Sequence, residues 1–302
     1  MGNLTMVTGF LLMDFSNTWE LQVLHAMLFL LIYLVALMGN LFIFTLISLN
    51  SHLHTPIYFF LKKLSFLNLC FFTVIVLKSA SHVFLEVLFI ASDIFLLTAM
   101  SFDHYVAICQ PLHYATIMKR EVCVWLVTLS WLSGALFGTL YSVSIFSLPF
   151  CGSKEVHQFF CDVPSLLRIS FSDTHTTVYL SIGIGFSLRI FCCISIIILY
   201  SHIFPTVLKI PTTEGRSKAF STCLHHLIVF IVFVITSAMA YLKPLLDSDL
   251  VLDLLLSIFY TVVPPTLNPL IYTLRNKDIK ISLKKLMTLQ HSSKRLIQKS
   301  FP

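Results

Sequence analysis

The chain has 302 residues, of which 57% are apolar, 14% aromatic and only 11% charged, and its mean hydropathy is +0.89. Soluble domains carry about a quarter charged residues, so this composition excludes a soluble domain, and it equally excludes a disordered chain or a small disulfide scaffold. In so apolar a chain, the net charge of +6 indicates basic residues gathered on one side of a membrane rather than binding of nucleic acid. The composition is that of an integral membrane protein.

Seven apolar runs are each long enough to cross the hydrocarbon core, which takes about 20 residues of helix. They are residues 24–48, 56–77, 83–108, 122–146, 178–204, 219–241 and 251–274. The short alternating strands of a membrane barrel are absent from the sequence. We therefore predict an all-α membrane protein with a seven-transmembrane-helix bundle over residues 24–274, between an extracellular N-terminus (1–23) and a cytoplasmic tail (275–302).

The distribution of Lys and Arg predicts that the N-terminus lies outside and the C-terminus lies in the cytosol. In this orientation fifteen of the 20 basic residues fall on the inner side and four on the outer side. Asn3, in Asn3-Leu4-Thr5, then becomes an external glycosylation acceptor. The tail opens with Lys280–Leu286, which fits either a short amphipathic helix on the inner leaflet or a disordered basic segment.

Eight sequence blocks recur in the order and topology of a known family. They are Gly39–Asn40, Leu53–Leu61, Leu64–Leu67, Met100–Cys109, Pro111–Tyr114, Ser130–Trp131, Lys218–Cys223 and Pro265–Tyr272. With these blocks the chain resembles the olfactory receptors, a branch of the rhodopsin-like G-protein-coupled receptors, over nearly its whole length. The resemblance implies a multi-pass receptor of the plasma membrane. It implies binding of small, mostly hydrophobic odorants within the bundle, and activation of a stimulatory heterotrimeric G protein in olfactory neurons.

Ionisable residues at membrane depth are functional candidates, because each costs at least ~2.5 kcal/mol to insert. Glu86 and Asp93 are seven residues apart and share one face of the third span, and Arg189 lies in the fifth. Glu86 falls at the level where rhodopsin-like receptors hold their ligand. It could bind a cationic odorant or pair with Arg189, and pairing is the less costly way to keep both charges in the membrane.

The resemblance places Asp93 in a polar centre with Asn40, Asn68 and Asn268. In the wider family this cluster holds a sodium ion, but Asn68 stands where an aspartate is usual, so the cluster has one charge fewer. Two interpretations stay open at this point. The cluster is either a sodium site or a buried polar network that only holds helices together.

The resemblance also implies a candidate ligand pocket and a set of coupling residues. The pocket is apolar with few hydroxyls, which suits a small hydrophobic ligand. Besides Glu86, its candidate residues are Val87, Ile90, Ala91, Ile184, Gly185, Leu188, Ser237, Ala238, Tyr241, Ile258 and Thr261. The residues implied in activation and G-protein coupling are Asp103, His104, Tyr105, Tyr200, Pro269 and Tyr272.

The sequence departs from the family pattern at three places. His104 replaces the arginine of an Asp-Arg-Tyr motif, and because a histidine lacks the guanidinium fork we expect weaker or pH-sensitive coupling. Only residues 78–82 separate the second and third spans, so a longer outer loop and its cysteine are missing. Both family disulfides therefore lack a partner, although Cys151 and Cys161 could bond each other. Val234 stands in the sixth span where the family pattern commonly has an aromatic side chain with a hydroxyl group.

Two other functions compete with that of an odorant receptor. One is an olfactory-receptor-like product with impaired folding or coupling. The other, from a different class, is an ion transporter or channel that uses Glu86, Asp93 and Arg189. An enzyme is not expected, because the sequence has no His/Cys cluster with metal spacing, no nucleophile elbow and no phosphate loop. No catalytic residue, metal or cofactor is predicted beyond the sodium ion considered above.

Overall fold

The computed structural model describes residues 11–12, 19–49, 55–75, 81–146, 155–156 and 176–242. These ranges contain six long helices: α1 (Trp19–Leu49), α2 (Pro56–Ile75), α3 (Ser81–Cys109), α5 (Arg120–Phe146), α7 (Thr176–Leu208) and α8 (Thr213–Leu242). A 3-10 turn, η2 (Pro111–His113), and the short helix α4 (Tyr114–Ile117) follow α3. The predicted seventh span and the tail helix lie outside the described residues.

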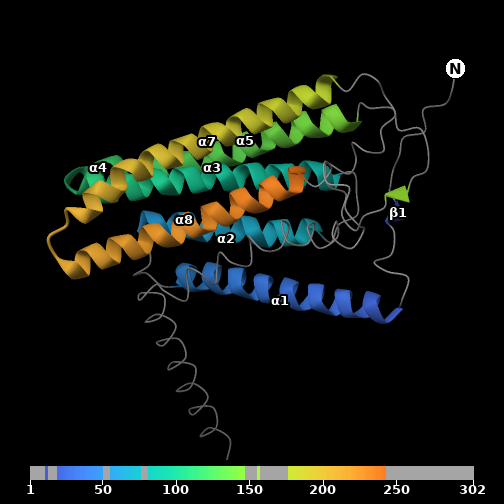
Figure 1. Ribbon diagram of the computed structural model, residues 1–302, viewed down its shortest axis with the longest axis horizontal. Helices are drawn as coiled ribbons and strands as arrows, with labels where there is room; N and C mark the ends of the chain where they lie inside the picture. The colour runs from blue at the N-terminus through green and yellow to red at the C-terminus, as the bar shows by residue number, and fades with distance from the viewer. Residues whose placement is uncertain are drawn as a thin grey trace, which may run out of the picture.

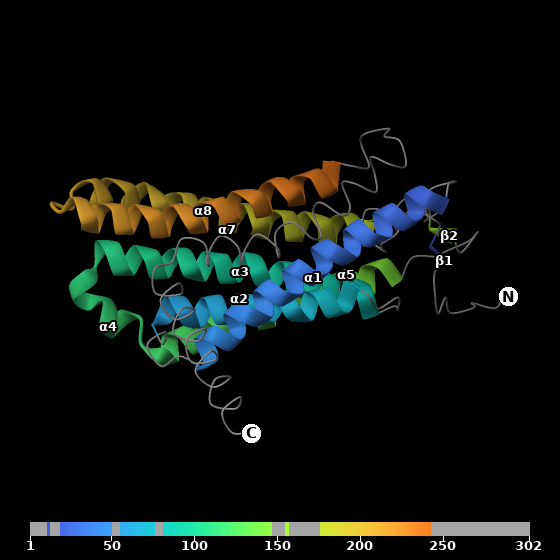
Figure 2. The same cartoon turned by 90° about the horizontal axis from the view of Figure 1, so that it is seen from below.

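The long helices match six of the seven predicted spans and run alternately up and down (Figures 1 and 2). Helix α4 and the α7–α8 connection lie at one end of the bundle, which the basic residues identify as the cytosolic side and which we call the inner end. Two strands that the sequence did not predict, β1 (Leu11–Leu12) and β2 (Glu155–Val156), pair in parallel at the opposite end.

Five of the helices contain stretches long and apolar enough to cross a membrane. These stretches are Leu30–Leu49, Val83–Cys109, Arg120–Ser144, Gly183–Leu208 and Thr213–Met239. Helix α2 has 20 residues and carries Lys62 and Lys63 in its inner half. It begins at Pro56, where the missing proline N–H costs nothing because the first turn of a helix has no acceptor for it.

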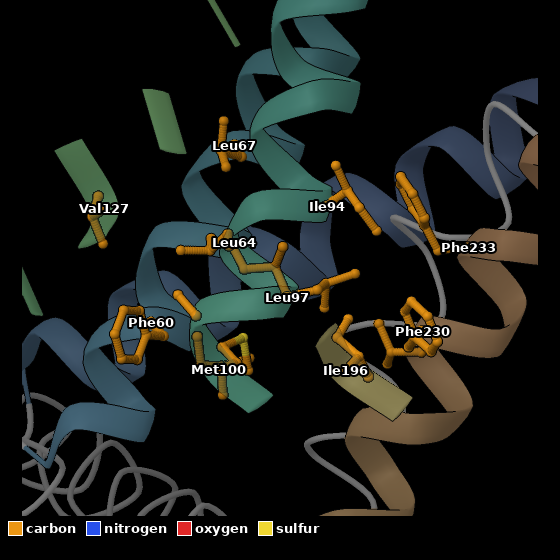
Figure 3. Close-up of a cluster of buried hydrophobic side chains, with 14 of the residues drawn as sticks. Phe60, Leu64, Leu67, Ile94, Leu97, Met100, Val127, Ile196, Phe230 and Phe233 are labelled. Atoms are coloured by element: carbon orange, nitrogen blue, oxygen red, sulfur yellow. The ribbon is translucent and has the colours of Figure 1, made fainter. Parts of the chain in front are cut away.

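Helix α3 lies at the centre of the bundle and packs against α2, α5, α7 and α8. Figure 3 shows the apolar side chains that meet between these helices. The largest fully buried side chains are Phe60, Leu61, Leu64 and Leu67 of α2, Leu96, Leu97 and Met100 of α3, and Ile43 and Leu46 of α1. Large apolar side chains such as Phe191 and Ile197 are more than half exposed, as expected for surfaces that face lipid.

Two glycines bring α5 into close contact with α3. A Cβ atom on Gly134 would lie 2.5 Å from the carbonyl oxygen of Leu88, and one on Gly138 would lie 2.8 Å from that of Phe84. Real Cβ atoms do not approach backbone oxygens so closely, so only glycine fits at these positions. The Gly134–Gly138 spacing is the small-xxx-small pattern that lets membrane helices approach closely.

Candidate functional site

The ionisable residues of α3 lie at three levels of the bundle. Glu86 is buried near the outer end, Asp93 lies about two turns further in, and Asp103 and His104 are buried at the inner end. Arg189, the predicted partner of Glu86, is half-buried on α7. Pairing between these two side chains stays a prediction.

Two of the four residues predicted for the polar centre contact each other directly. The Asn68 Nδ2 atom of α2 donates to Asn40 Oδ1 of α1 over 3.2 Å, and Asn40 Nδ2 donates to the carbonyl oxygen of Ala36 over 2.9 Å. The Asp93 Oδ1 and Asn68 Oδ1 atoms are buried and accept no hydrogen bond from the described residues. Asn268 lies outside the described residues, so sodium binding and a purely structural network both remain predictions.

At the inner end, Asp103 accepts a hydrogen bond that the sequence did not predict. The Tyr114 hydroxyl, at the start of α4, donates to Asp103 Oδ1 over 2.9 Å. Burial, together with the neighbouring Asp103 carboxylate, raises the pKa of Tyr114 above its ordinary value. The phenol therefore remains a neutral donor at physiological pH, and it links the loop after α3 to the helix itself.

His104, the residue in the place of the family arginine, is 3% exposed and faces α8. Its ring centroid lies 5.2 Å from that of His226, and within the described helices neither of its ring nitrogens makes a hydrogen bond. His226, by contrast, uses both nitrogens: Nδ1 lies 3.0 Å from the Tyr200 hydroxyl of α7 and Nε2 lies 2.9 Å from the Leu97 carbonyl oxygen of α3. One imidazole thus joins α3, α7 and α8.

A second group of contacts joins the inner ends of α3 and α7. The Cys109 thiol lies 3.5 Å from the Thr206 hydroxyl and 3.7 Å from the carbonyl oxygen of His202. The Tyr105 ring packs against the His202 ring with centroids 6.3 Å apart. The predicted coupling residues Asp103, His104, Tyr105 and Tyr200 therefore gather around the inner ends of three helices.

The described candidates for the ligand pocket are distributed over three helices. Val87, Ile90 and Ala91 of α3 are half-buried, as are Gly185 and Leu188 of α7 and Ser237 of α8, whereas Ile184 and Ala238 are exposed. Gly185 lies beside Tyr141 of α5, whose hydroxyl would be 2.9 Å from an added Cβ atom. The remaining calls lie outside the side chains that the structure describes: Tyr241, Ile258, Thr261, Pro269, Tyr272, Asn3, Cys151 and Cys161.

Comparison with known proteins decides the family. A family model described as "Olfactory receptor" matches residues 29–290. The chain belongs to the olfactory receptor family. It is 54% identical to human olfactory receptor 14A2 over 303 aligned residues, with 95% of this chain and 96% of that protein covered. It is 50% identical to human olfactory receptor 14A16 and 39% identical to the dog olfactory receptor-like protein OLF1, each over at least 94% of both chains.

Membership confirms the resemblance found in the sequence and the multi-pass membrane location. Tyr114 and His226 make hydrogen bonds that join different elements at the inner end, but neither was among the sequence-based site candidates. His226 stands next to His225 in the sequence, and adjacent helical residues point about 100° apart, so the pair does not form a metal site. A better signal was available, since Cys223, His226 and Phe230 follow helical spacing and form the buried face of α8.

Proposed function

We propose that this chain binds small, mostly hydrophobic odorants within the outer half of the bundle and activates a stimulatory heterotrimeric G protein at the inner end. Family membership supports the class of ligand and partner. The half-buried apolar residues Val87, Ile90 and Ala91 on α3 support a shape-selective, weakly polar ligand site. Glu86, buried above them, gives that site an acidic group.

The His226 contacts carry the proposal for the inner end. Because its imidazole bonds to Tyr200 on α7 and to Leu97 on α3, α8 cannot move outward without losing both hydrogen bonds. Ligand binding between the outer halves of the same helices can favour such a movement by binding the open arrangement more tightly. The movement would uncover His104, which packs against His226 and is now 3% exposed.

His104 sets the expected strength of coupling. The guanidinium group of an arginine presents five donors in a planar fork, whereas a neutral imidazole presents one donor and one acceptor. We expect the chain to couple more weakly than relatives that carry the arginine. An olfactory-receptor-like product with impaired folding or coupling, and an ion transporter or channel, are the alternatives that the following experiment separates.

The experiment measures surface exposure of an N-terminally tagged chain and cAMP production in the same cells during an odorant panel. We expect an odorant-dependent cAMP rise that increases in His104→Arg and does not increase in His104→Gln. Glu86→Gln and Tyr241→Phe then test ligand contacts by shifting the half-maximal odorant concentration.

The outcomes separate the alternatives. Surface exposure without any odorant response, in both the parent chain and His104→Arg, would contradict the proposal. Absence of the parent from the surface would favour impaired folding. Ion flux that depends on Asp93 and needs no G protein would favour the transporter.

A further inference from the structure

Two lysines of α2, Lys62 and Lys63, lie inside the helix rather than in a loop. Lys62 is six residues from the helix start at Pro56, which places it about 9 Å along the helix from the inner end. Both side chains are half-buried, and no carboxylate in the described part of the chain lies within salt-bridge distance of either ammonium group. An ammonium group has three donors, so each retains capacity for an anionic partner.

Each ammonium group rests on an aromatic ring. The Lys62 Nζ atom lies over the Phe44 ring of α1, 5.1 Å from its centroid, and the Lys63 Nζ atom lies 5.7 Å from the Phe59 centroid. Such contacts hold a cation in place without neutralising it. The positive charge of Lys62 is thus held where α1 and α2 meet, which Figure 2 shows as a crossing of the two helices.

An aromatic surface runs outward from this charge. Phe66 lies one turn beyond Lys62 on the same face of α2, and its ring packs against Phe44 at 6.0 Å and against Trp131 of α5 at 6.1 Å. We call Phe44, Phe66 and Trp131 the aromatic strip. The Phe66 side chain is 40% exposed, so neighbouring helices do not cover the strip completely. Phe89 of α3 packs edge-on against Trp131, at 6.0 Å, and fixes one end of the strip.

A cation at the inner end of an apolar strip suits an amphipathic anion, whose charged headgroup would lie at the inner end and whose apolar chain would extend outward. We propose that this α1–α2–α5 face binds an anionic glycerophospholipid of the inner leaflet, with its phosphate on Lys62 and an acyl chain along the aromatic strip. Lys63 adds positive potential from the next position of the helix. The depth of Lys62 favours a lipid over a cytosolic protein partner, and the adjoining strip favours a lipid over a free phosphate.

Helix geometry supports this pairing of one headgroup with one chain. Lys62 and Phe66 are four residues apart and share a face, so Phe66 lies about 6 Å outward from Lys62 along the axis of α2. The helices that carry the strip also have exposed apolar side chains near it in sequence, with Leu41 of α1 at 47% and Leu132 of α5 at 60% exposure. The site does not depend on odorant binding or G-protein coupling, so its test is independent of the proposed function.

Trp131 provides a direct optical readout in the full-length chain. The protein has three tryptophans, and Trp125, whose side chain is 65% exposed, is replaced by phenylalanine to lower the background. This protein is placed in nanodiscs of phosphatidylcholine that contain a minor fraction of phosphatidylserine, with bromine on the acyl chains of one lipid or the other. Bromine quenches tryptophan fluorescence on contact, and a Trp131→Phe variant identifies the quenching that belongs to Trp131.

We expect brominated phosphatidylserine to quench Trp131 more than its share of the bilayer predicts. Lys62→Gln should lower the preference of Trp131 for phosphatidylserine over phosphatidylcholine about fivefold, the effect of removing one lysine near an anionic surface. Lys62→Arg should retain the preference. The matched control is Lys209→Gln/Lys218→Gln, which removes two exposed basic residues at the inner end and should leave the quenching unchanged.

Equal quenching of Trp131 by the two brominated lipids in the parent protein would overturn the proposal. An unchanged preference in Lys62→Gln would overturn it as well. If Lys62→Gln fails to fold, Lys62→Arg and an increase in ionic strength replace it. Salt should then reduce the preference in the parent, because the headgroup contact is electrostatic, and a salt-independent preference would refute the assigned contact.

Discussion

At the scale of single residues, the buried polar groups at the inner end of the bundle differ in the number of hydrogen bonds they make with the described residues. His226 uses both ring nitrogens, and Asp103 accepts from Tyr114, whereas neither nitrogen of His104 bonds to a residue that the structure describes. Buried polar groups normally have partners, and an unsatisfied one costs free energy. Among the described residues, the position of the family arginine therefore has fewer hydrogen bonds than the two polar groups near it.

The hydrogen bond between Tyr114 and Asp103 gives a first prediction. Tyr114→Phe leaves a buried Asp103 oxygen without its donor, and we expect a loss of about 1–3 kcal/mol of stability. Thermal unfolding of the purified protein in detergent should show a lower midpoint. Tyr105→Phe is the matched control, because the described contact of Tyr105 is made by its ring with His202. Equal midpoints for the two variants would show that the hydrogen bond is not stabilising.

The contact between Tyr200 and His226 gives a second prediction. Tyr200→Phe removes the hydroxyl that binds His226 Nδ1, so α7 and α8 lose a restraint at their inner ends. We expect higher basal cAMP in cells that express equal surface amounts of the variant and the parent. Ser195→Ala is a suitable control, because the hydrogen bond described for its hydroxyl goes to the Phe191 carbonyl oxygen of the same helix. Unchanged basal cAMP in Tyr200→Phe would argue against this restraint.

At the scale of elements, the apolar runs predicted where helices occur better than where they end. Helix α8 begins at Thr213, six residues before the predicted span at 219. The apolar run did not include these first turns because their residues are polar. Hydropathy reports the part of a helix that lies in lipid, whereas the backbone hydrogen bonds continue into the interface. Helix α7 likewise continues to Leu208, through Pro205, although its apolar run was expected to end at 204.

The close approach of α3 and α5 gives a third prediction. In Gly134→Ala, the new Cβ atom would lie 2.5 Å from the Leu88 carbonyl oxygen, so the two helices must separate. We expect lower surface expression and a lower unfolding midpoint. Gly183→Ala is the control, because an added Cβ atom there meets nothing within 4 Å and alanine favours helix by about 1 kcal/mol. The prediction fails if both variants reach the surface in equal amounts.

At the scale of the whole molecule, the sequence predicted the class and orientation of the bundle more completely than its sites. Length, apolarity and the inner excess of basic residues are summed over many positions, so single substitutions hardly change them. Contacts such as Tyr114 with Asp103 depend on the path of one loop, and His226 with Leu97 depends on the rotation of two helices. Periodicity identifies the buried face of a helix but does not identify the atoms that meet it.

Orientation gives the last prediction, because the inner-end sites and the lipid site both require the N-terminus outside. Asn3 should then carry a glycan that an amidase removes, and Asn3→Gln should migrate on a gel like the deglycosylated parent. Asn17→Gln, which lies on the same side but in no acceptor sequence, should leave the shift intact. An epitope at the N-terminus should be stained on intact cells, and one at the C-terminus only after permeabilisation. Reversed staining would place Lys62, His104 and Tyr114 on the outer side, where neither an inner-leaflet lipid nor a G protein could reach them.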